Sequence, residues 1–325
     1  MHSMMRKVMG VIAAAMLFSA SAHASEPLRV GYSDWPGWVL WEVAIQKQWF
    51  KQEGLDVKFE WFDYVASMDA FAAGKIDIVG MTNGDTLVTG STGAKGIMFL
   101  LNDYSNGNDM IVAKPGINSI KDLKGKKIGV EIGFVDHLLV LNALKKNGLK
   151  ESDVTLVNVP TNETPQVLAS GQVDAIAAWQ PSSGIALQQV PGSKPIYTSA
   201  DEPGLIYDVY AASPKVYAKR KDDLKKFLKV WYRAVDYFYD PKTREDAIKI
   251  MASRVGLKPA EYKKFVLGTK ILKLEEAKKY MTKVKGFKSV TGSTKISDDF
   301  NVANKVYKKP EDVSSYIDFS LTLGM

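Results

Sequence analysis

The 325-residue chain contains no cysteine. Disulfides, thiolate catalysis, cysteine-bound zinc and iron–sulfur clusters are therefore excluded. It has three histidines, His2, His23 and His137, and the first two lie in an N-terminal segment that we expect to be removed. No G-x-S-x-G, H-E-x-x-H or P-loop motif occurs either. Few groups remain for acid–base or nucleophilic chemistry, so we expect a binding protein without a cofactor or metal rather than an enzyme.

Long apolar runs are also scarce, and the N-terminal one has the features of a signal peptide. Arg6 and Lys7 precede an apolar stretch, Val8 to Phe18, that is too short to span a bilayer. Ala22-His23-Ala24 then resembles a cleavage site, so residues 1–24 are predicted to be removed. Without a cysteine there is no lipoprotein attachment site, and we expect a free protein in a bacterial periplasm.

The composition is that of a folded globular protein, with 46% hydrophobic and 24% charged residues. The length allows about two domains of ~150 residues each. The net charge of +7 raises the possibility of a nucleic-acid partner. However, lysines cluster late in the chain at helical spacing, as in Lys221, Lys225 and Lys229. We interpret them as a solvated helix face and expect no nucleic-acid partner.

An internal repeat suggests two lobes that are built alike. The segment Phe71-Ala-Ala-Gly-Lys-Ile-Asp77 aligns with Leu168-Ala-Ser-Gly-Gln-Val-Asp174 at an offset of 97 residues. Further matches around Leu28 and Gly54 keep the same order and nearly the same offset. We interpret the repeated Asp77 and Asp174 as structural residues.

Each repeat unit predicts alternating strands and helices, which is typical of an α/β fold with a mainly parallel sheet. In the first unit we expect strands over 28–32, 57–62 and 76–81, and helices over 38–53 and 68–73. In the second unit we expect strands over 127–130, 154–159 and 173–178, and helices over 137–147 and 165–170.

Two segments are expected to connect the lobes, at Met110–Ala113 and Tyr207–Ala211. The predicted first lobe comprises residues 25–111 and 210–325, and the predicted second lobe comprises residues 112–209. Two crossings of this kind form a hinge with a cleft between the lobes.

Several motifs in combination resemble periplasmic solute-binding proteins of ABC importers, in the class for nitrate, sulfonates, taurine and thiamine-precursor pyrimidines. They are Arg29-Val-Gly-Tyr, the Ala-x-Gly-x-x-Asp element of the first lobe with its counterpart in the second, and Asp122-Leu-Lys-Gly-Lys-Lys-Ile-Gly129. The resemblance implies the two-lobed type II binding-protein fold, a small-molecule ligand, an ABC permease as partner and a monomer. Within this class, Gly31–Trp38, Met81–Asp85 and Asn102–Asp109 look like the branch associated with urea and guanidine carboxylation.

In open parallel sheets, ligands bind beyond the carboxyl ends of the strands. This rule selects loops that are rich in acidic and aromatic residues. The candidate ligand-binding residues are Asp34, Trp35, Tyr64, Thr82, Asn83, Asp85, Asp103, Glu131, Phe134 and Trp179. Carboxylates can bind a planar guanidinium in bidentate fashion, and aromatic faces attract a desolvated cation. We therefore expect a small cationic nitrogen compound, with guanidine as the first candidate.

Alternatives remain open at this level. The ligand could be urea, a small amidine or amine, or an aliphatic sulfonate such as taurine. In similar sulfonate binders a small hydroxyl residue commonly follows the glycine of the first loop in the second lobe, whereas Phe134 follows Gly133 here. Asp34 and Asp85 could instead cap helices. A catalytic or an adhesive role is the remaining alternative to a binding protein. A pyrimidine-synthesising enzyme resembles this class, but it relies on cysteines that are absent here.

Overall fold

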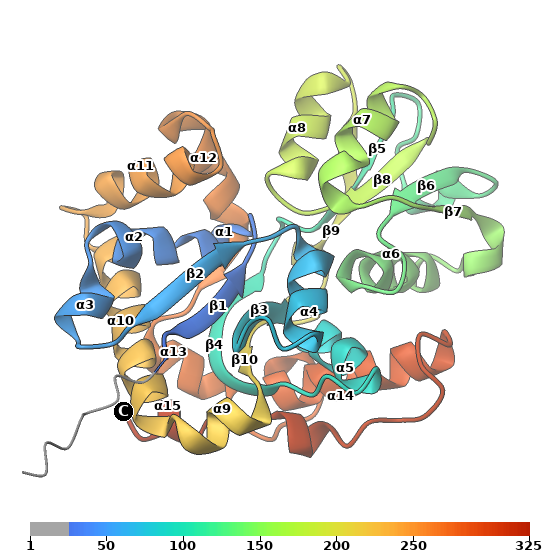
Figure 1. The fold of residues 1–325 in the computed structure, drawn as a ribbon. Coiled ribbons are helices and arrows are strands. Elements are labelled where there is room, and N and C mark those ends of the chain that lie inside the picture. Colours follow the sequence, from blue (N-terminus) through green and yellow to red (C-terminus); the bar gives the residue numbers. More distant parts are fainter. Residues whose placement is uncertain (1–25) are drawn as a thin grey trace, which may run out of the picture.

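The computed structural model describes residues 26–325 and arranges their strands in two sheets (Figure 1). The predicted signal peptide, residues 1–24, lies outside the described residues. The first sheet has the strand order β11-β4-β10-β3-β1-β2 and the second the order β7-β6-β8-β5-β9. The first-sheet strands are β1 (Leu28–Tyr32), β2 (Val57–Trp61), β3 (Ile78–Thr82), β4 (Ile97–Ser105), β10 (Tyr207–Ala212) and β11 (Thr269–Ile271). The second-sheet strands are β5 (Met110–Ala113), β6 (Lys127–Val130), β7 (Thr155–Asn158), β8 (Ala175–Ala178) and β9 (Lys194–Thr198).

The repeat found in the sequence corresponds to the same three-stranded arrangement in each sheet. Strand β1 pairs in parallel with β2 and β3, and β6 pairs in parallel with β7 and β8. The repeated aspartates have matching contacts: Asp77 accepts a hydrogen bond from the backbone N of Arg29 at 3.0 Å, and Asp174 accepts one from that of Lys127 at 2.9 Å. Both aspartates therefore tie together the starts of two neighbouring parallel strands, and the prediction that they are structural is confirmed.

Both sheets are mixed, and the parallel part predicted from the sequence is confined to these three-stranded units. β10 pairs antiparallel with β3 and β4, and β5 pairs antiparallel with β8 and β9. Each of these strands follows a connection from the other sheet, so it enters its own sheet in the direction opposite to the parallel strands. The prediction that Met110–Ala113 and Tyr207–Ala211 connect the lobes is wrong, because these residues form β5 and most of β10 within the sheets. The connecting segments are residues 106–109 and 199–206, which run side by side. The hydroxyl oxygens of Ser105 and Ser199 lie 2.6 Å apart.

The single helix predicted over residues 38–53 is wrong, because the structure divides this stretch into three helices. They are α1 (Pro36–Val39), α2 (Trp41–Gln46) and α3 (Trp49–Gln52). Gln48 adopts a left-handed conformation with φ of 55°, which interrupts the pattern of helical hydrogen bonds before α3. The next predicted helix begins earlier than expected, since α4 spans Tyr64–Ala72. Tyr64 is thus the first residue of a helix and not part of a loop.

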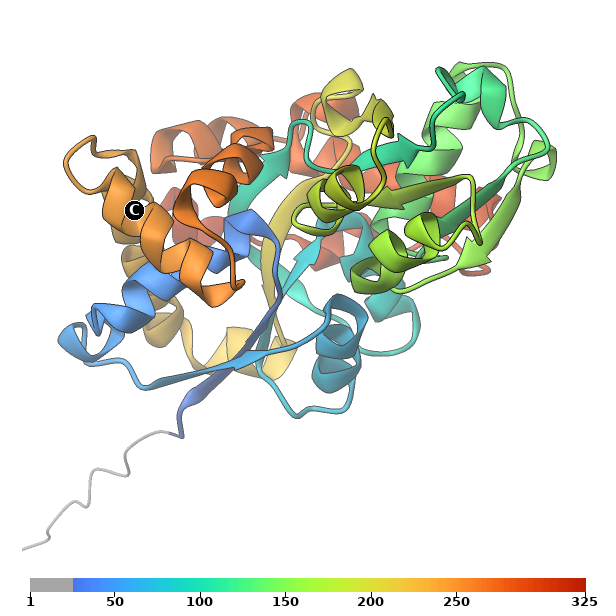
Figure 2. The same cartoon turned by 90° about the horizontal axis from the view of Figure 1, so that it is seen from above.

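Helices cover both sheets, and we call each sheet with its helices a lobe (Figure 2). In the second lobe α6 (Val135–Lys146), α7 (Thr164–Ala169) and α8 (Ser182–Gln189) pack on the strands. In the first lobe the longest helix is α10 (Lys221–Tyr239), whose Trp231 and Phe227 pack against Trp41 at ring distances of 4.8 and 4.4 Å. The other helices are α5 (Asn83–Ser91), α9 (Pro214–Lys219), α11 (Arg244–Arg254), α12 (Pro259–Phe265), α13 (Leu274–Tyr280), α14 (Val290–Ala303) and α15 (Ser320–Leu323). Over residues 26–325, none of the helices has the length and apolar character needed to cross a membrane.

Candidate functional site

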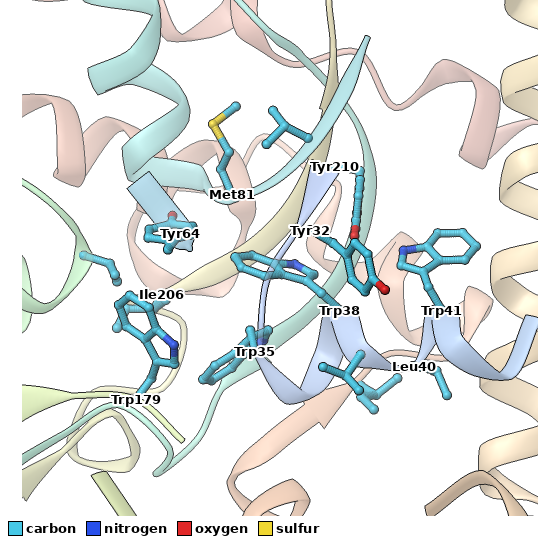
Figure 3. Close-up of a cluster of buried hydrophobic side chains, with 14 of the residues drawn as sticks. Tyr32, Trp35, Trp38, Leu40, Trp41, Tyr64, Met81, Trp179, Ile206 and Tyr210 are labelled. Atoms are coloured by element: carbon cyan, nitrogen blue, oxygen red, sulfur yellow. The ribbon is translucent and has the colours of Figure 1, made fainter. Parts of the chain in front are cut away.

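Four aromatic side chains meet where the two lobes face each other (Figure 3). Trp35, Trp38 and Tyr64 come from the first lobe, and Trp179 follows β8 of the second lobe. The rings of Trp38 and Tyr64 are stacked, with centroids 5.5 Å apart. Those of Tyr64 and Trp179 meet edge to face at 5.2 Å. All four side chains are at most 5% exposed, so they form a continuous aromatic wall between the lobes.

These rings enclose a small chamber. Its other lining residues are Thr82, Asp109, Val135 and Asp208. The chamber comprises about 220 Å³ of space between atoms, but its walls are so close together that only about one water molecule would fit. A ligand of a few heavy atoms requires only a slight separation of these walls, whereas a large solute requires the lobes to open.

The carboxyl groups of Asp109 and Asp208 line this chamber, and in the described residues one oxygen of each has no hydrogen-bond donor. Each residue is 2% exposed. Within residues 26–325, no donor reaches the Oδ2 atom of either side chain. Burial raises the pKa of Asp109 to about 7, and burial with the nearby Asp103 and Asp109 raises the pKa of Asp208. A buried polar group that lacks a partner carries a desolvation cost, which a bound cation with several N–H donors would offset.

A second set of acids lies behind the chamber. The indole Nε1 of Trp35 donates to Oδ1 of Asp103 at 2.9 Å, and the hydroxyl of Tyr64 donates to Oδ2 of Asp85 at 2.7 Å. Burial raises the pKa of Asp103 to about 7 and that of Asp85 to about 6. Asp136, in the first turn of α6, is fully buried, and its pKa is raised by burial and by the neighbouring acids. In the described part of the chain, neither of its carboxyl oxygens receives a hydrogen bond.

An open hollow of about 780 Å³ leads toward the chamber from outside, and Tyr64 and Trp179 line both spaces. Asp34 and Glu131 also line this hollow. Burial raises the pKa of Asp34 to about 6 and that of Glu131 to about 7, and Thr161 donates to the Glu131 carboxylate at 3.2 Å. A positively charged solute that enters the cleft therefore meets acidic groups before it reaches the aromatic wall.

The remaining candidates from the sequence have structural contacts. The hydroxyl of Thr82 caps α5 by accepting from the backbone N of Asp85 at 3.0 Å. The side chain of Asn83 donates to Ser293 and Thr294 at 3.1 Å each, and accepts from the backbone of β10. Phe134 is half-buried and lines a neighbouring cavity at the start of α6, outside the aromatic chamber. His137 lies within α6, is 4% exposed, and accepts a hydrogen bond from the backbone N of Gly133 at 3.2 Å.

Neither Asp34 nor Asp85 caps a helix. Helix α1 begins after Trp35 with no side-chain cap, and α5 is capped by Thr82. The carboxylates of Asp34 and Asp85 instead contact groups near the cleft. The capping alternative considered for these two residues is therefore excluded.

Sequence reasoning did not select Asp109, Asp136, Asp208 or Trp38 as ligand-binding candidates. A signal was present for Asp208, because it is a charged residue within the apolar strand Tyr207–Ala212. Charged residues are almost never fully buried unless they are paired, so a strand of this kind deserves a functional interpretation. Asp136 carried no comparable signal, because an acidic residue in the first turn of a helix is common.

Three contacts across the cleft hold the lobes together in a closed arrangement. The indole Nε1 of Trp179 donates to Oδ1 of Asp34 at 3.2 Å. The rings of Tyr64 and Trp179 touch, and the backbone amide of Val135 in the second lobe contacts the Asp85 carboxylate of the first. All three contacts involve residues beside the chamber, so the same contacts join the lobes and shape the chamber.

The acids of the cleft do not form a metal site. Among residues 26–325, no group of three or more histidine, aspartate or glutamate side chains is arranged to hold a metal ion. The acids are spread around the aromatic rings, and two of them, Asp109 and Asp208, line the chamber. This arrangement suits an organic cation better than a compact metal ion.

Residues 39–244 match the protein family described as NMT1/THI5 like. The chain belongs to this family. A binding protein of Brucella abortus (strain 2308) is 27% identical over 319 residues, which cover 96% of this chain and 97% of that protein. An aliphatic sulfonates-binding protein of Escherichia coli (strain K12) is 25% identical over 266 residues, covering 78% of this chain and 81% of its own length.

Solved structures show the same fold. The periplasmic aliphatic sulphonate binding protein of Escherichia coli superposes with a TM-score of 0.75 at 22% identity, covering 90% of this chain and 92% of that one. The desulfurization enzyme DSZB also shares the fold, with a TM-score of 0.63 at 14% identity and coverage of 92% and 98%. The predicted two-lobed α/β fold is thus confirmed, and the fold by itself hosts both binding proteins and an enzyme.

Proposed function

We propose that this protein is an exported, periplasmic substrate-binding protein of an ABC importer. It captures a small planar nitrogen cation between its lobes and delivers it to the permease. Guanidinium is the first candidate. The observation that carries the proposal is a chamber between the lobes that is lined by aromatic rings and by two buried carboxyl groups, Asp109 and Asp208. In the described residues, the Oδ2 atom of each carboxyl group has no hydrogen-bond donor.

The chemistry of these walls matches a guanidinium ion. Charge-assisted hydrogen bonds to a carboxylate are about twice as strong as neutral ones, and the planar fork of a guanidinium can bind a carboxylate in bidentate fashion. Aromatic faces add about 2 kcal/mol or more for a desolvated cation. Trp38 and Tyr64 supply such a stacked aromatic surface beside Asp109 and Asp208.

The alternative ligand is an aliphatic sulfonate or taurine, and the names of the relatives support it. Helices α5 and α6 also begin at the cleft, and helix N-termini attract anions. However, both helices carry an acidic residue in their first turn, Asp85 and Asp136. The chamber, the outer hollow and the neighbouring cavity at Phe134 have no lysine or arginine among their lining residues, within the part of the chain that the structure describes. The balance of charge therefore opposes an anion.

In this proposal the first lobe is residues 26–105 with 207–325 and the second is residues 110–198. The boundaries expected from the sequence, 25–111 with 210–325 and 112–209, cut through β5 and β10. The chain acts as a monomer, and it binds its ligand without turning it over. The single mature histidine, His137, is buried within α6, and its pKa is lowered by burial, so it is poorly placed to exchange protons with a ligand.

Calorimetric titration of the purified mature protein tests the proposal, with guanidinium chloride, urea and taurine as three matched ligands. Urea is a neutral molecule of nearly the same shape as guanidinium, so it isolates the contribution of charge. We expect binding in the order guanidinium, then urea, with no taurine binding. A ligand at about 100 times its Kd should also stabilise the protein by ~2.7 kcal/mol in a thermal-shift assay. Tight taurine binding without guanidinium binding would establish the sulfonate alternative.

A further inference from the structure

Two aspartates at the base of the chamber are direct neighbours. Asp103 of β4 and Asp208 of β10 occupy opposite positions in the antiparallel pairing of these strands. They are 0% and 2% exposed, and their carboxyl groups are hydrogen-bonding neighbours. The Oδ2 atoms of both residues lack a donor elsewhere in residues 26–325. A hydrogen bond between two carboxyl groups requires that one of them carry a proton.

The surroundings of this pair fix its position. The indole Nε1 of Trp35 holds Oδ1 of Asp103, and a methyl group at Gly37 would come within 2.0 Å of Oδ2 of Asp103. A glycine at position 37 therefore leaves the space that the Asp103 carboxyl group occupies beside α1. Asp103 does not line the chamber, whereas Asp208 does.

The charged groups that act on the pair are also acids. The charge of Asp109, in the connection after β4, raises the pKa of both members of the pair. The charge of Asp85 in α5 raises the pKa of Asp208. The charge of Asp103 in turn raises the pKa of Tyr210 in β10 and of Tyr239 in α10. Lys270 of the adjacent β11 donates its Nζ to Glu276 at 3.2 Å. Since the groups acting on the pair bring no positive charge, a shared proton is what lowers the charge of the pair from −2 to −1 in the empty site.

We infer that the cationic ligand replaces this proton, so that ligand capture is coupled to proton release. This inference rests on the proposed function. Asp208 contacts the ligand, and Asp103 is a positioning residue that holds the shared proton behind it. On binding, the carboxyl O–H bond breaks, the proton passes to water, and the carboxylate pairs with the cation. The net charge of the site is the same before and after.

This coupling gives ligand affinity a defined pH dependence. Below the pKa of the pair, each captured cation must displace one proton, so affinity rises about tenfold per pH unit. Burial raises the pKa of Asp208 well above its usual value, and the nearby Asp103 and Asp109 raise it further, so the pair keeps its proton far above the range of a free carboxyl group. Above the pKa of the pair, both groups are already ionised and affinity becomes independent of pH.

The test is calorimetric titration with millimolar or lower guanidinium chloride, from pH 5.5 to 8.5, in phosphate and in Tris. The difference in apparent binding enthalpy between two buffers with different ionisation enthalpies measures the protons released. We expect release of at least one proton per ligand at pH 6, where the pair and Asp109 both hold protons, and a smaller release at pH 8.5. Asp103→Asn preserves the acceptor for Trp35 but cannot share a proton, so it should reduce the release at pH 6 and flatten the pH dependence. Asp69→Asn makes the same change of charge at an exposed position of α4 and should behave like the parent.

Two outcomes would overturn the inference. The first is guanidinium binding with no difference between the buffers, which would leave the proposed function intact. The second is parental proton release in Asp103→Asn, because the proton would then come from another acid. Absence of guanidinium binding at every pH would instead contradict the proposed function, and the coupling with it.

Discussion

The indole Nε1 of Trp179 donates a hydrogen bond to Oδ1 of Asp34 at 3.2 Å and thereby joins the two lobes directly above the chamber. Both partners come from loops that follow strands, one from each lobe. Trp179 also closes the aromatic wall through its edge-to-face contact with Tyr64. A single side chain therefore both joins the lobes and covers the chamber.

Substitution Trp179→Phe separates these two roles, because phenylalanine keeps an aromatic surface but has no N–H. A hydrogen bond contributes about 0.5–1.5 kcal/mol, so we expect guanidinium to bind roughly 2- to 10-fold more weakly. Calorimetric titration measures this loss. Asp34→Asn keeps an oxygen that can accept from Trp179, so it preserves this hydrogen bond and serves as the comparison. Unchanged affinity in Trp179→Phe would show that this hydrogen bond makes no contribution to binding.

The carboxylate of Asp109 should bind the ligand directly, because it lines the chamber and its Oδ2 atom lacks a donor in the described chain. Asp109→Asn retains the shape and removes the charge. A hydrogen bond to a charged group is worth ~1.5–3 kcal/mol, so guanidinium affinity should fall about 10- to 100-fold. Asp69→Asn should bind like the parent in the same titration. If Asp109→Asn bound guanidinium as tightly as Asp69→Asn, the carboxylate would not be a ligand contact.

The stability of the empty protein should fall as pH rises. Burial raises the pKa of Asp34 and Asp85 to about 6 and that of Asp109 to about 7, from values near 4 in the unfolded chain. Between these values the folded state binds more protons than the unfolded state. The stabilisation is complete below about pH 4 and is lost as pH rises through about 6 to 7.

Thermal unfolding between pH 4.5 and 8 measures this effect. We expect Tm to decrease over this range without ligand, and to decrease less when guanidinium chloride is present at millimolar concentration. Asp103→Asn removes one of the buried acids and should show a smaller decrease than the parent. A Tm that rises steadily toward pH 8 in the parent would contradict the assignment of raised pKa values to the cleft acids.

The sequence alone predicted the position of the cleft better than it predicted the acidic residues that line the chamber. Strands β1 and β6 were predicted with the bounds that the structure shows, because short apolar stretches preceding a loop are typical of buried strands. The repeat correctly indicated two lobes with related sheets. Trp35, Tyr64 and Trp179 were selected by the rule that ligands lie at the carboxyl ends of parallel strands, and all three line the chamber.

The pairing of Asp103 with Asp208 could not be predicted. It depends on β10 lying antiparallel to β4, with register shifts between Asp208 and Val209 and between Tyr210 and Ala211. A sequence pattern reports which face a residue occupies, but not which residue of a distant strand lies opposite. Similarly, the helix predicted over residues 38–53 is interrupted by the left-handed backbone of Gln48. Neither a glycine nor a proline stands at this position to indicate the interruption.

Ligand binding should move the lobes as rigid bodies. The connecting segments are short and are tied together between Ser105 and Ser199, so a small rotation there opens the whole cleft. Small-angle X-ray scattering should show a smaller radius of gyration with guanidinium than without it, and far-UV circular dichroism should stay the same. Identical scattering curves under conditions where calorimetry shows saturation would rule out closure upon binding.

A crystal structure of the mature protein grown with guanidinium chloride tests the central claim most directly. The account predicts a planar ligand within the chamber, stacked on the rings of Trp38 or Tyr64, with its nitrogens within about 3 Å of the carboxylates of Asp109 and Asp208. The same crystals grown with taurine should leave the chamber free of ligand. Taurine in the chamber, or guanidinium found only on the surface, would contradict the claim that this cleft selects a small cation.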